Sequence, residues 1–259
     1  MTEIRELRTD EPVHATAPRT GDAFGETLLA ALASGPAPAA VSEVIERDDG
    51  LIVASDAHRY FRTPEAWQEP IRWAVAQARG RVLDVGVGAG RHALAAAAAG
   101  CEVTGLDVSE GAVEVSRRRG VRAVRGAGEH ADRLFGPGSF DTVFLLGQNL
   151  ALLASPERAG DLLGVLRAVT APGASILGDS QDPASGSARN EAYFARNRDR
   201  GRPPGQFVLR ARYLDLATPW FDYWYCSPHE LEAVAAPHGW RLEDARRAGT
   251  TYSVRLRRV

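Results

Sequence analysis

Two aspartates and three alternating glycines are the residues whose types and spacing most clearly predict a ligand site. They are Asp84, Gly86, Gly88, Gly90 and Asp107. Residues 81–85 are an apolar strand, and glycines after a strand let the backbone turn sharply, approach a ligand closely and expose amide donors. An alanine-rich helix follows, and a second apolar strand, 101–106, ends at Asp107, whose carboxylate can accept hydrogen bonds from ribose hydroxyls. The sequence therefore predicts a nucleotide-binding βαβ unit.

The spacing of the glycines separates two classes of cofactor. Dinucleotide-binding proteins use Gly-x-Gly-x-x-Gly, in which the third glycine allows close packing of the helix. Here that third position is Arg91. The pattern Asp-Val-Gly-Val-Gly-Ala-Gly at 84–90, with Asp107 closing the second strand, resembles that of the class I S-adenosylmethionine-dependent methyltransferases. A site of that class binds no pyrophosphate.

The resemblance implies contacts to S-adenosylmethionine and to its product, S-adenosylhomocysteine. Asp84 and the loop 86–90 would hold the amino-acid end, Asp107 would bind the ribose hydroxyls, and Val108 would lie against the adenine. An ammonium-bearing sulfonium ligand also favours a nearby carboxylate over a phosphate-binding site. The further cofactor-binding residues that the resemblance implies are Ala127, Gly128, Glu129, Leu146 and Gln148. Many members of the family have an aspartate at the first of these, so here backbone groups or the glutamate must contact the adenine.

Polar residues also follow two later strands that the resemblance predicts. Gln148 and Asn149 come after the strand 140–146, at the edge where open α/β sheets bind ligands. They either orient the acceptor or cap the segment that follows. Asp179 follows the strand 174–177 and either binds an amine or a metal or makes structural hydrogen bonds. The Asn-Pro-Pro-Tyr motif of many nucleic-acid and glutamine methyltransferases is absent, which argues against those acceptors.

Composition shifts divide the chain into three parts. We expect a flexible tail at 1–20, N-terminal cap or lid elements at 21–78, and a methyltransferase domain at 79–259. The segment 184–226 is not part of a minimal methyltransferase and is expected to form a β-rich substrate insert after the fifth strand. Placed there, it should overhang the methyl group of the cofactor and shape the acceptor pocket.

The cap is predicted to contain helices and one hairpin. The expected elements are a helix at 22–33, strands at 41–46 and 51–54, and a helix that begins at Pro64. Tyr60 and Arg62 are candidate lid residues that contact the substrate. Aromatic residues at helical spacing also fit a core, so a structural role for this segment stays open.

The insert combines an arginine-rich run with aromatic strands. Arg196 belongs to the run and could contact a carboxylate or phosphate of the acceptor, or lie on a solvated loop. Strands are expected at 206–214 and 220–225. The insert residues that could line the acceptor pocket are Tyr193, Tyr213, Trp220 and Tyr223. Because strand side chains alternate between faces, half of the strand aromatics should fill core instead.

No general base is established by the sequence. The candidates are His130, Asp179, Tyr193 and His229. Each histidine also fits the role of a loop or helix-start residue. The lack of an evident base is compatible with an acceptor that needs little help in losing a proton.

The overall composition is that of an ordinary soluble chain of 259 residues, 44% hydrophobic and 25% charged. With a net charge of −2, the chain lacks the excess of positive charge that would attract nucleic acid or an anionic membrane. No apolar stretch approaches the length of a membrane span. Cys101 and Cys226 form neither a disulfide framework nor a metal cluster. We therefore expect a cytoplasmic protein with no metal. Arginine without lysine suggests a high-GC bacterial genome, in which methyltransferases often serve specialised metabolism.

These observations predict a Rossmann-like α/β fold with a seven-stranded, mostly parallel sheet, helices on both faces and an antiparallel last strand. The expected function is methyl transfer from S-adenosylmethionine to a small-molecule or peptide acceptor, with no nucleic-acid partner. Three alternatives remain: a noncatalytic module that binds the cofactor, an NAD-dependent oxidoreductase, and a nucleic-acid methyltransferase. The acceptor, the methylated atom and the oligomeric state do not follow from the sequence.

Overall fold

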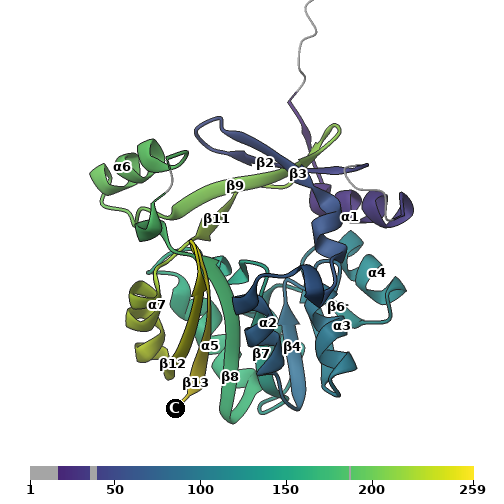
Figure 1. The fold of residues 1–259 in the computed structure, drawn as a ribbon, viewed down its shortest axis with the longest axis vertical. Helices are drawn as coiled ribbons and strands as arrows, with labels where there is room; N and C mark the ends of the chain where they lie inside the picture. The colour runs from purple at the N-terminus through teal and green to yellow at the C-terminus, as the bar shows by residue number, and fades with distance from the viewer. Residues whose placement is uncertain (1–16, 36–39, 187) are drawn as a thin grey trace, which may run out of the picture.

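A seven-stranded sheet forms the lower part of the molecule (Figure 1). The computed structural model describes residues 17–35, 40–186 and 188–259. In spatial order the strands are β12 (Trp240–Ala248), β13 (Thr251–Arg258), β8 (Thr170–Gln181), β7 (Phe140–Leu145), β4 (Arg81–Val85), β5 (Glu102–Asp107) and β6 (Arg122–Arg125). The strands from β8 to β6 are parallel, whereas β13 is antiparallel to both of its neighbours. The predicted fold class is confirmed.

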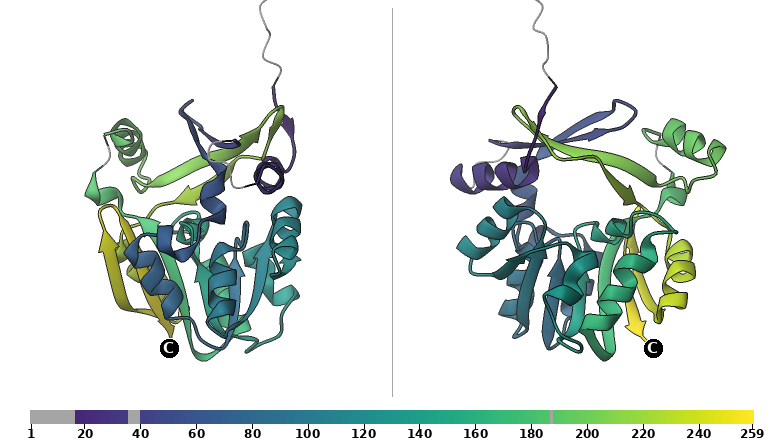
Figure 2. Two further views of the ribbon diagram at one scale, coloured as in Figure 1. Left: turned by 45° about the vertical axis from the view of Figure 1, so that its right-hand side comes forward. Right: turned by 180° about the vertical axis from the view of Figure 1, so that it is seen from behind.

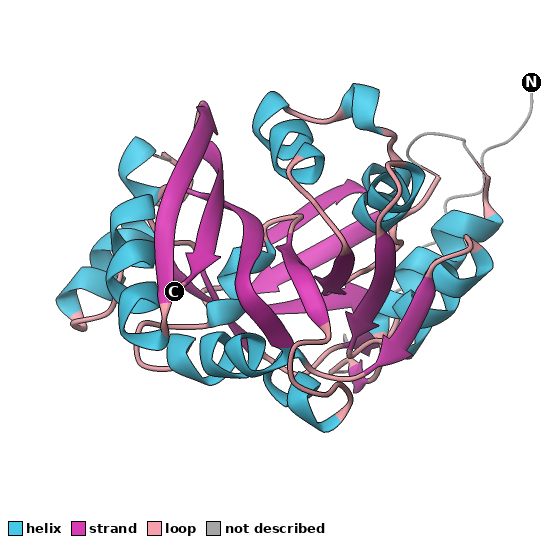
Figure 3. Cartoon of the chain, turned by 90° about the horizontal axis from the view of Figure 1, so that it is seen from below, coloured by secondary structure: helices cyan, strands magenta, loops and turns pink. Residues whose placement is uncertain are grey.

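Helices cover both faces of this sheet (Figures 2 and 3). Val82 and Leu83 are neighbours in β4 and enter different cores, because successive strand side chains point to opposite faces. The helices around the sheet are α2 (Glu69–Ala76), α3 (Arg91–Ala98), α4 (Glu110–Arg118), α5 (Ala159–Val169) and α7 (Pro228–Ala235). α2 and α3 pack on the Val82 side, and α5 and α7 pack on the Leu83 side. Among the described helices, none has the length and apolar character that crossing a membrane requires.

A second sheet lies across the upper edge of the first, where the parallel strands end (Figure 1). We call it the roof sheet. Its strands are β1 (Arg19–Thr20), β10 (Leu216–Ala217), β9 (Gln206–Tyr213), β2 (Ser42–Arg47), β3 (Ile52–Asp56) and β11 (Phe221–Trp224). The expected N-terminal hairpin is β2–β3, and β2 pairs with β9 of the insert. The cap and the insert are therefore one structure, not two separate additions.

Several expected boundaries differ from the structure. Arg19 and Thr20 pair with β10, so the end of the expected flexible tail is an ordered strand, while residues 1–16 lie outside the described residues. The helix expected from Pro64 is a single turn, η2 (Pro64–Ala66), and α2 begins only at Glu69. Trp67 is extended between them, with its indole buried, which interrupts the helix.

The remaining elements are short and lie between the strands and helices already named. They are η1 (Ala57–Phe61), η3 (Gly128–Arg133), η4 (Asn149–Leu153), η5 (Pro183–Ser185), α6 (Glu191–Asp199) and η6 (Ala236–His238). Two helices begin at a serine that caps them. Ser109 accepts a hydrogen bond from the Ala112 amide, and Ser227 forms a capping box with Glu230.

α1 (Ala23–Ala33) docks against α4 through a shared aspartate. The Asp22 carboxylate accepts from the Gly25 amide of its own helix, and also from the Ser109 hydroxyl and the Gly111 amide. The helices cross at Gly25 and Gly111, where a Cβ on Gly111 would lie 2.6 Å from the Gly25 backbone. One carboxylate thus fixes the N-terminal helix on the domain that bears the glycine motif.

Replacing Asp22 by alanine should lower the free energy of unfolding by about 1–2 kcal/mol, because an N-cap and two bonds to α4 are lost together. Urea unfolding measures the change. Asp22→Asn is the control, since its amide oxygen can still cap α1, and it should lose less. Equal unfolding midpoints for Asp22→Ala and the wild type would contradict this account.

Candidate active site

The glycine loop between β4 and α3 is closed by its own hydrogen bonds. Gly86, Gly88 and Gly90 have φ angles of +72°, +54° and +76°, which only glycine adopts without strain. The amides of Gly86 and Val87 donate to the Leu106 carbonyl, and the Gly90 amide donates to Val87. The Gly88 amide donates to the Asp107 carboxylate at 2.9 Å. These four amides are therefore not free to bind a pyrophosphate.

Asn149 holds the same loop from the neighbouring strand. Its side-chain amide nitrogen donates to the carbonyls of Val85 and Gly86, each at 2.9 Å. A Cβ on Gly86 would lie 2.4 Å from that nitrogen, so the close approach also requires glycine. Asn149 thus bonds the end of β4, whereas the sequence suggested that it caps its own segment or orients the acceptor.

Asp107 is buried at the end of β5 and is only partly used by the protein. Its two oxygens accept from the amides of Gly88 and Ser109. A carboxylate has about four acceptor positions, so capacity remains for two hydroxyl groups of a ribose. Burial raises the pKa of Asp107 to about 6. The adjacent Val108 side chain is 64% exposed and offers an apolar surface beside this carboxylate.

Asp84 is a buried carboxylate that is only partly satisfied by hydrogen bonds. Its side chain is 1% exposed, and Oδ2 has no partner among the described residues. Burial, followed by the negative charge of Asp107, raises the pKa of Asp84 to about 8. An ionised carboxylate in such a place is costly unless a cation or a donor meets it. The site therefore suits a ligand that carries a positive charge.

Tyrosines and a carboxylate reach this edge from the roof sheet. Tyr60 donates its hydroxyl proton to Glu43, which also accepts from Arg59 at 2.5 Å. Tyr223 donates to the backbone carbonyl of Gln148 at 2.9 Å, and Tyr225 donates to the Gln148 side-chain oxygen. The roof is thereby tied to the turn after β7.

Asp179 fixes that turn from below. It is 1% exposed, and its carboxylate accepts from the Gly147 amide at 2.6 Å and from the Gln148 amide at 3.1 Å. Burial raises the pKa of Asp179 to about 6. In the described structure its bonds are structural, which is one of the two roles that the sequence left open.

The structure brings some of the sequence candidates to one place. Those at or beside the upper edge of the seven-stranded sheet are Tyr60, Asp84, Asp107, Val108, Gln148, Asn149, Asp179 and Tyr223. Ala127 and Gly128 begin η3, directly after β6 at the same edge. The side chain of Leu146 packs in the core with Phe144 and Leu177, so a contact of Leu146 with the cofactor would be made by its backbone.

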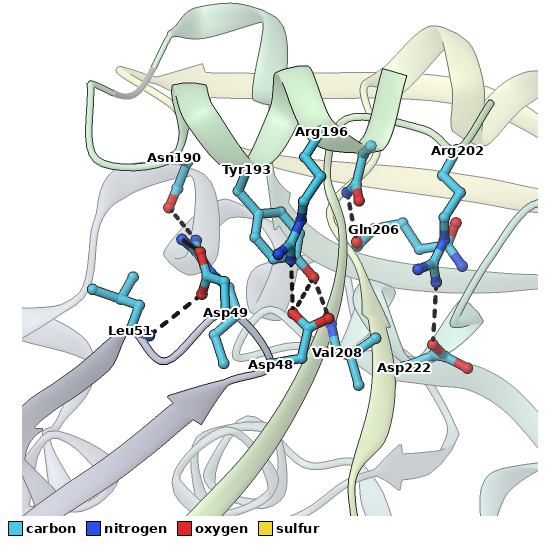
Figure 4. A network of polar contacts seen from close by, with 12 residues as sticks. Asp48, Asp49, Leu51, Asn190, Tyr193, Arg196, Arg202, Gln206, Val208 and Asp222 are labelled. Carbon is cyan, nitrogen blue, oxygen red and sulfur yellow. Dashed lines mark hydrogen bonds and ion pairs between the residues drawn. The ribbon is translucent and has the colours of Figure 1, made fainter. Parts of the chain in front are cut away.

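Tyr193 and Arg196 belong to a separate network of hydrogen bonds and ion pairs (Figure 4). The Tyr193 hydroxyl donates to Asp48 at 2.7 Å and Arg196 donates to the same carboxylate at 3.2 Å. Arg47 stacks over the Tyr193 ring at 4.2 Å and makes a paired contact with Asp49. These residues fasten α6 to the turn between β2 and β3, and their expected roles in catalysis and substrate binding stay predictions.

The remaining candidates lie outside this cluster. Arg62, Glu129, His130 and His229 are exposed. His229 stands in the first turn of α7 on the flank of the lower sheet, and Trp220 stacks with Arg210 at 4.4 Å. Tyr213 ends β9 next to the short β10. No hydrogen bond in the described structure joins any of these side chains to the glycine loop, and the catalytic roles suggested for the two histidines stay predictions.

Sequence reasoning missed four residues of the cluster: Glu43, Arg59, Arg91 and Tyr225. Tyr225 follows Tyr223 by two positions, a spacing that could have placed both on one face of a strand. Glu43 gave no signal, because a glutamate at the start of a hairpin is normally exposed, whereas this one is 2% exposed. In residues 17–35, 40–186 and 188–259, no three His, Cys, Asp or Glu side chains gather where they could hold a metal ion.

Residues 82–173 match the family described as "Methyltransferase domain". This match places a methyltransferase domain in that part of the chain. A methyltransferase structure from Bacteroides fragilis, in complex with S-adenosyl-L-homocysteine, is similar to this chain, with a TM-score of 0.74 and 26% identity. The match covers 91% of this chain and 94% of the Bacteroides fragilis chain. A methyltransferase from Methanosarcina mazei, 17% identical, shares the fold over 74% of this chain and 98% of its own, with a TM-score of 0.59.

A demethylmenaquinone methyltransferase of Clavibacter sepedonicus is 36% identical over 118 residues. The match covers 44% of this chain and 46% of that protein, so it spans about half of the relative's length. It supports the class of domain. It does not identify the acceptor, because the same fold hosts many functions.

The unusual pKa of Asp84 predicts a pH-dependent stability. Because its pKa is raised in the folded state, the folded protein binds the proton more tightly than the unfolded chain, and stability should fall as the pH rises from about 4 to about 8. Above about pH 6.5, Asp107 and Asp179 are largely ionised, so the remaining change reports Asp84. We expect a loss of up to about 1.4 kcal/mol per pH unit between pH 6.5 and 8.

Urea unfolding of the ligand-free wild type and of Asp84→Asn across this range provides the measurement. The asparagine has no charge to bury, so the variant should show a flat profile and exceed the wild type most at pH 8.5. Parallel profiles for the two proteins would show that Asp84 does not titrate here.

Proposed function

We propose that the protein transfers a methyl group from S-adenosylmethionine to a small-molecule acceptor. The observation that carries the proposal is the unpartnered Oδ2 atom of Asp84 beside a glycine loop whose own hydrogen bonds close it. A ligand with an ammonium group satisfies that oxygen, whereas a pyrophosphate would meet a nearby carboxylate and loop amides that are largely occupied. These features support the sulfonium cofactor over a nicotinamide dinucleotide.

The residues present fit the cofactor along the edge of the sheet. Asp84 would hold the ammonium, Asp107 the ribose hydroxyls, and Val108 would cover one face of the adenine, with backbone groups near Ala127 at its edge. When bound, the cofactor supplies a methyl group already activated by the sulfonium charge. The protein therefore has to align the nucleophile and keep water away.

The roof residues support an enclosed acceptor position above the turn 147–149. Tyr223 and Tyr225 each donate their hydroxyl proton to an oxygen of Gln148, so toward a ligand their oxygens can only accept hydrogen bonds. They suit the N–H or O–H group of an acceptor. Glu43 is a buried carboxylate of the roof sheet, and Arg59 and Tyr60 hold it in place. This arrangement supports a compact organic acceptor. A role in specialised metabolism stays a prediction from composition.

Binding of the cofactor is expected to stabilise the fold. S-adenosylmethionine or S-adenosylhomocysteine at about a hundred times its dissociation constant should add about 2.7 kcal/mol to the free energy of unfolding, and NAD should add nothing. Thermal unfolding with each ligand tests this, and transfer of a labelled methyl group to a panel of small acceptors tests catalysis. Stabilisation by NAD alone would refute the proposal, and cofactor binding without transfer to any acceptor would favour a noncatalytic module.

Affinity for S-adenosylhomocysteine is expected to rise with pH. The ammonium of the ligand needs the ionised form of Asp84, and most of that carboxyl is protonated below about pH 8. The dissociation constant should therefore fall by up to tenfold per pH unit between about pH 6 and 8. Isothermal titration calorimetry at four pH values measures it. Asp84→Asn should bind more weakly and show no such slope, and a slope that persists in the variant would assign the effect to another group.

A further inference from the structure

Arg91 has hydrogen-bonding capacity that the protein does not use. It is the first residue of α3, directly after the glycine loop. Its Nε lies 3.1 Å from Nε2 of His92, and its Nη1 donates to the Arg59 carbonyl at 2.8 Å. Nη2 makes no hydrogen bond within the described part of the chain and lies 3.6 Å from where a Cβ on Gly147 would be. A guanidinium has five N–H donors, so donors remain on the side facing the turn after β7.

The orientation of Arg91 is fixed by His92. Burial, followed by the charge of Arg91, holds the pKa of His92 well below its usual value, so this imidazole is neutral. Its Nε2 accepts from the guanidinium, which places the imidazole proton on Nδ1. Trp67 packs edge-on against the ring, with centroids 4.9 Å apart. The guanidinium is thereby held in one plane.

Arg91 and Asp84 are opposite charges that are both without an ion pair. No carboxylate among the described residues forms a salt bridge with Arg91, although Asp84 and Asp179 lie within electrostatic range. Asp84 Oδ2 is buried and unpartnered, as described above. A partly buried cation and a buried anion that face the same loop, without contacting each other, are complementary to a zwitterion. An α-amino acid has that charge arrangement.

The same guanidinium contacts the cap. The Arg59 carbonyl that accepts from Nη1 belongs to η1, and the Arg59 side chain binds Glu43 and the Tyr60 hydroxyl. Arg91 therefore lies between the loop that would hold the amino-acid end of the cofactor and the residues that would face the acceptor. A ligand that binds Arg91 in this position also favours the arrangement in which η1 is held.

We propose that Arg91 binds the carboxylate of the cofactor's amino-acid end, opposite Asp84, and that its bond to the Arg59 carbonyl couples this contact to the closure of η1. The proposal rests on the function proposed above. It makes Arg91 a positioning residue, through which a bound cofactor stabilises the position of η1 beside the acceptor. A nucleoside without the amino-acid end would fill the adenosine part of the site and leave η1 uncoupled.

The test compares S-adenosylmethionine with its decarboxylated form, which keeps the amine, the sulfonium and the adenosine. In the wild type, loss of the carboxylate should raise the dissociation constant about tenfold to a hundredfold, as for a lost charge-assisted bond. Hydrogen exchange should show that S-adenosylmethionine protects the amides of residues 57–61 and that the decarboxylated form does not. Equal affinities and equal protection in the wild type would overturn the proposal without any variant.

Arg91→Met tests whether this residue reads the carboxylate. In the variant the two ligands should bind with similar affinity, and neither should protect residues 57–61. Arg119→Met is the matched control, because Arg119 also joins the loop to the cap, through the Ala89 carbonyl and the Phe61 ring at 5.0 Å. It should preserve the difference between the ligands. If the two ligands still differ in affinity for Arg91→Met, the proposal is refuted and the proposed function is not. A wild type that binds neither ligand refutes both.

Discussion

The Asp107 carboxylate is the contact on which the upper edge of the lower sheet depends. It joins the end of β5 to the Gly88 amide and to the Ser109 amide at the start of α4. With the bonds from Gly86 and Val87 to Leu106, it forces the chain after β4 into a turn that only glycines adopt. Asp84 lies buried at the end of β4, directly before this loop, and its Oδ2 has no hydrogen-bond partner among the described residues.

The roof sheet is held over that edge by polar contacts at three separate places. Asp22 fastens α1 to α4, the tyrosines of the insert bind Gln148, and the Arg47 network fastens α6 to the hairpin. Each contact joins segments that are far apart in the sequence. The buried arginine in the last network is stacked on aromatic rings and bonded to Asp49 and Asn190, so its charge is satisfied without solvent. The acceptor side is thus built by contacts whose partners no local pattern specifies.

This difference explains what the sequence could predict. The glycine motif, Asp84 and Asp107 were predictable because positive φ angles and a strand-ending carboxylate have few residue choices, and the caps at Ser109 and Ser227 were local for the same reason. The pairing of β2 with β9 was not predictable, since alternation shows that a strand exists but not which strand lies beside it. Tyr193 and Arg196 were expected at the acceptor, but their partner Asp48 lies 145 or more residues away in the chain.

The pairing of β2 with β9 also sets an order for assembly. β2 ends at Arg47, but its partner β9 begins only at Gln206. While the chain is synthesised, β4, β5, β6 and β7 can form from contacts near in sequence, whereas the hairpin β2–β3 must wait with an open edge for β9. Late, long-range pairing of this kind folds slowly and leaves an unpaired strand exposed to other chains. The nucleotide-binding half can therefore fold first in each newly made chain, and the acceptor side is completed last.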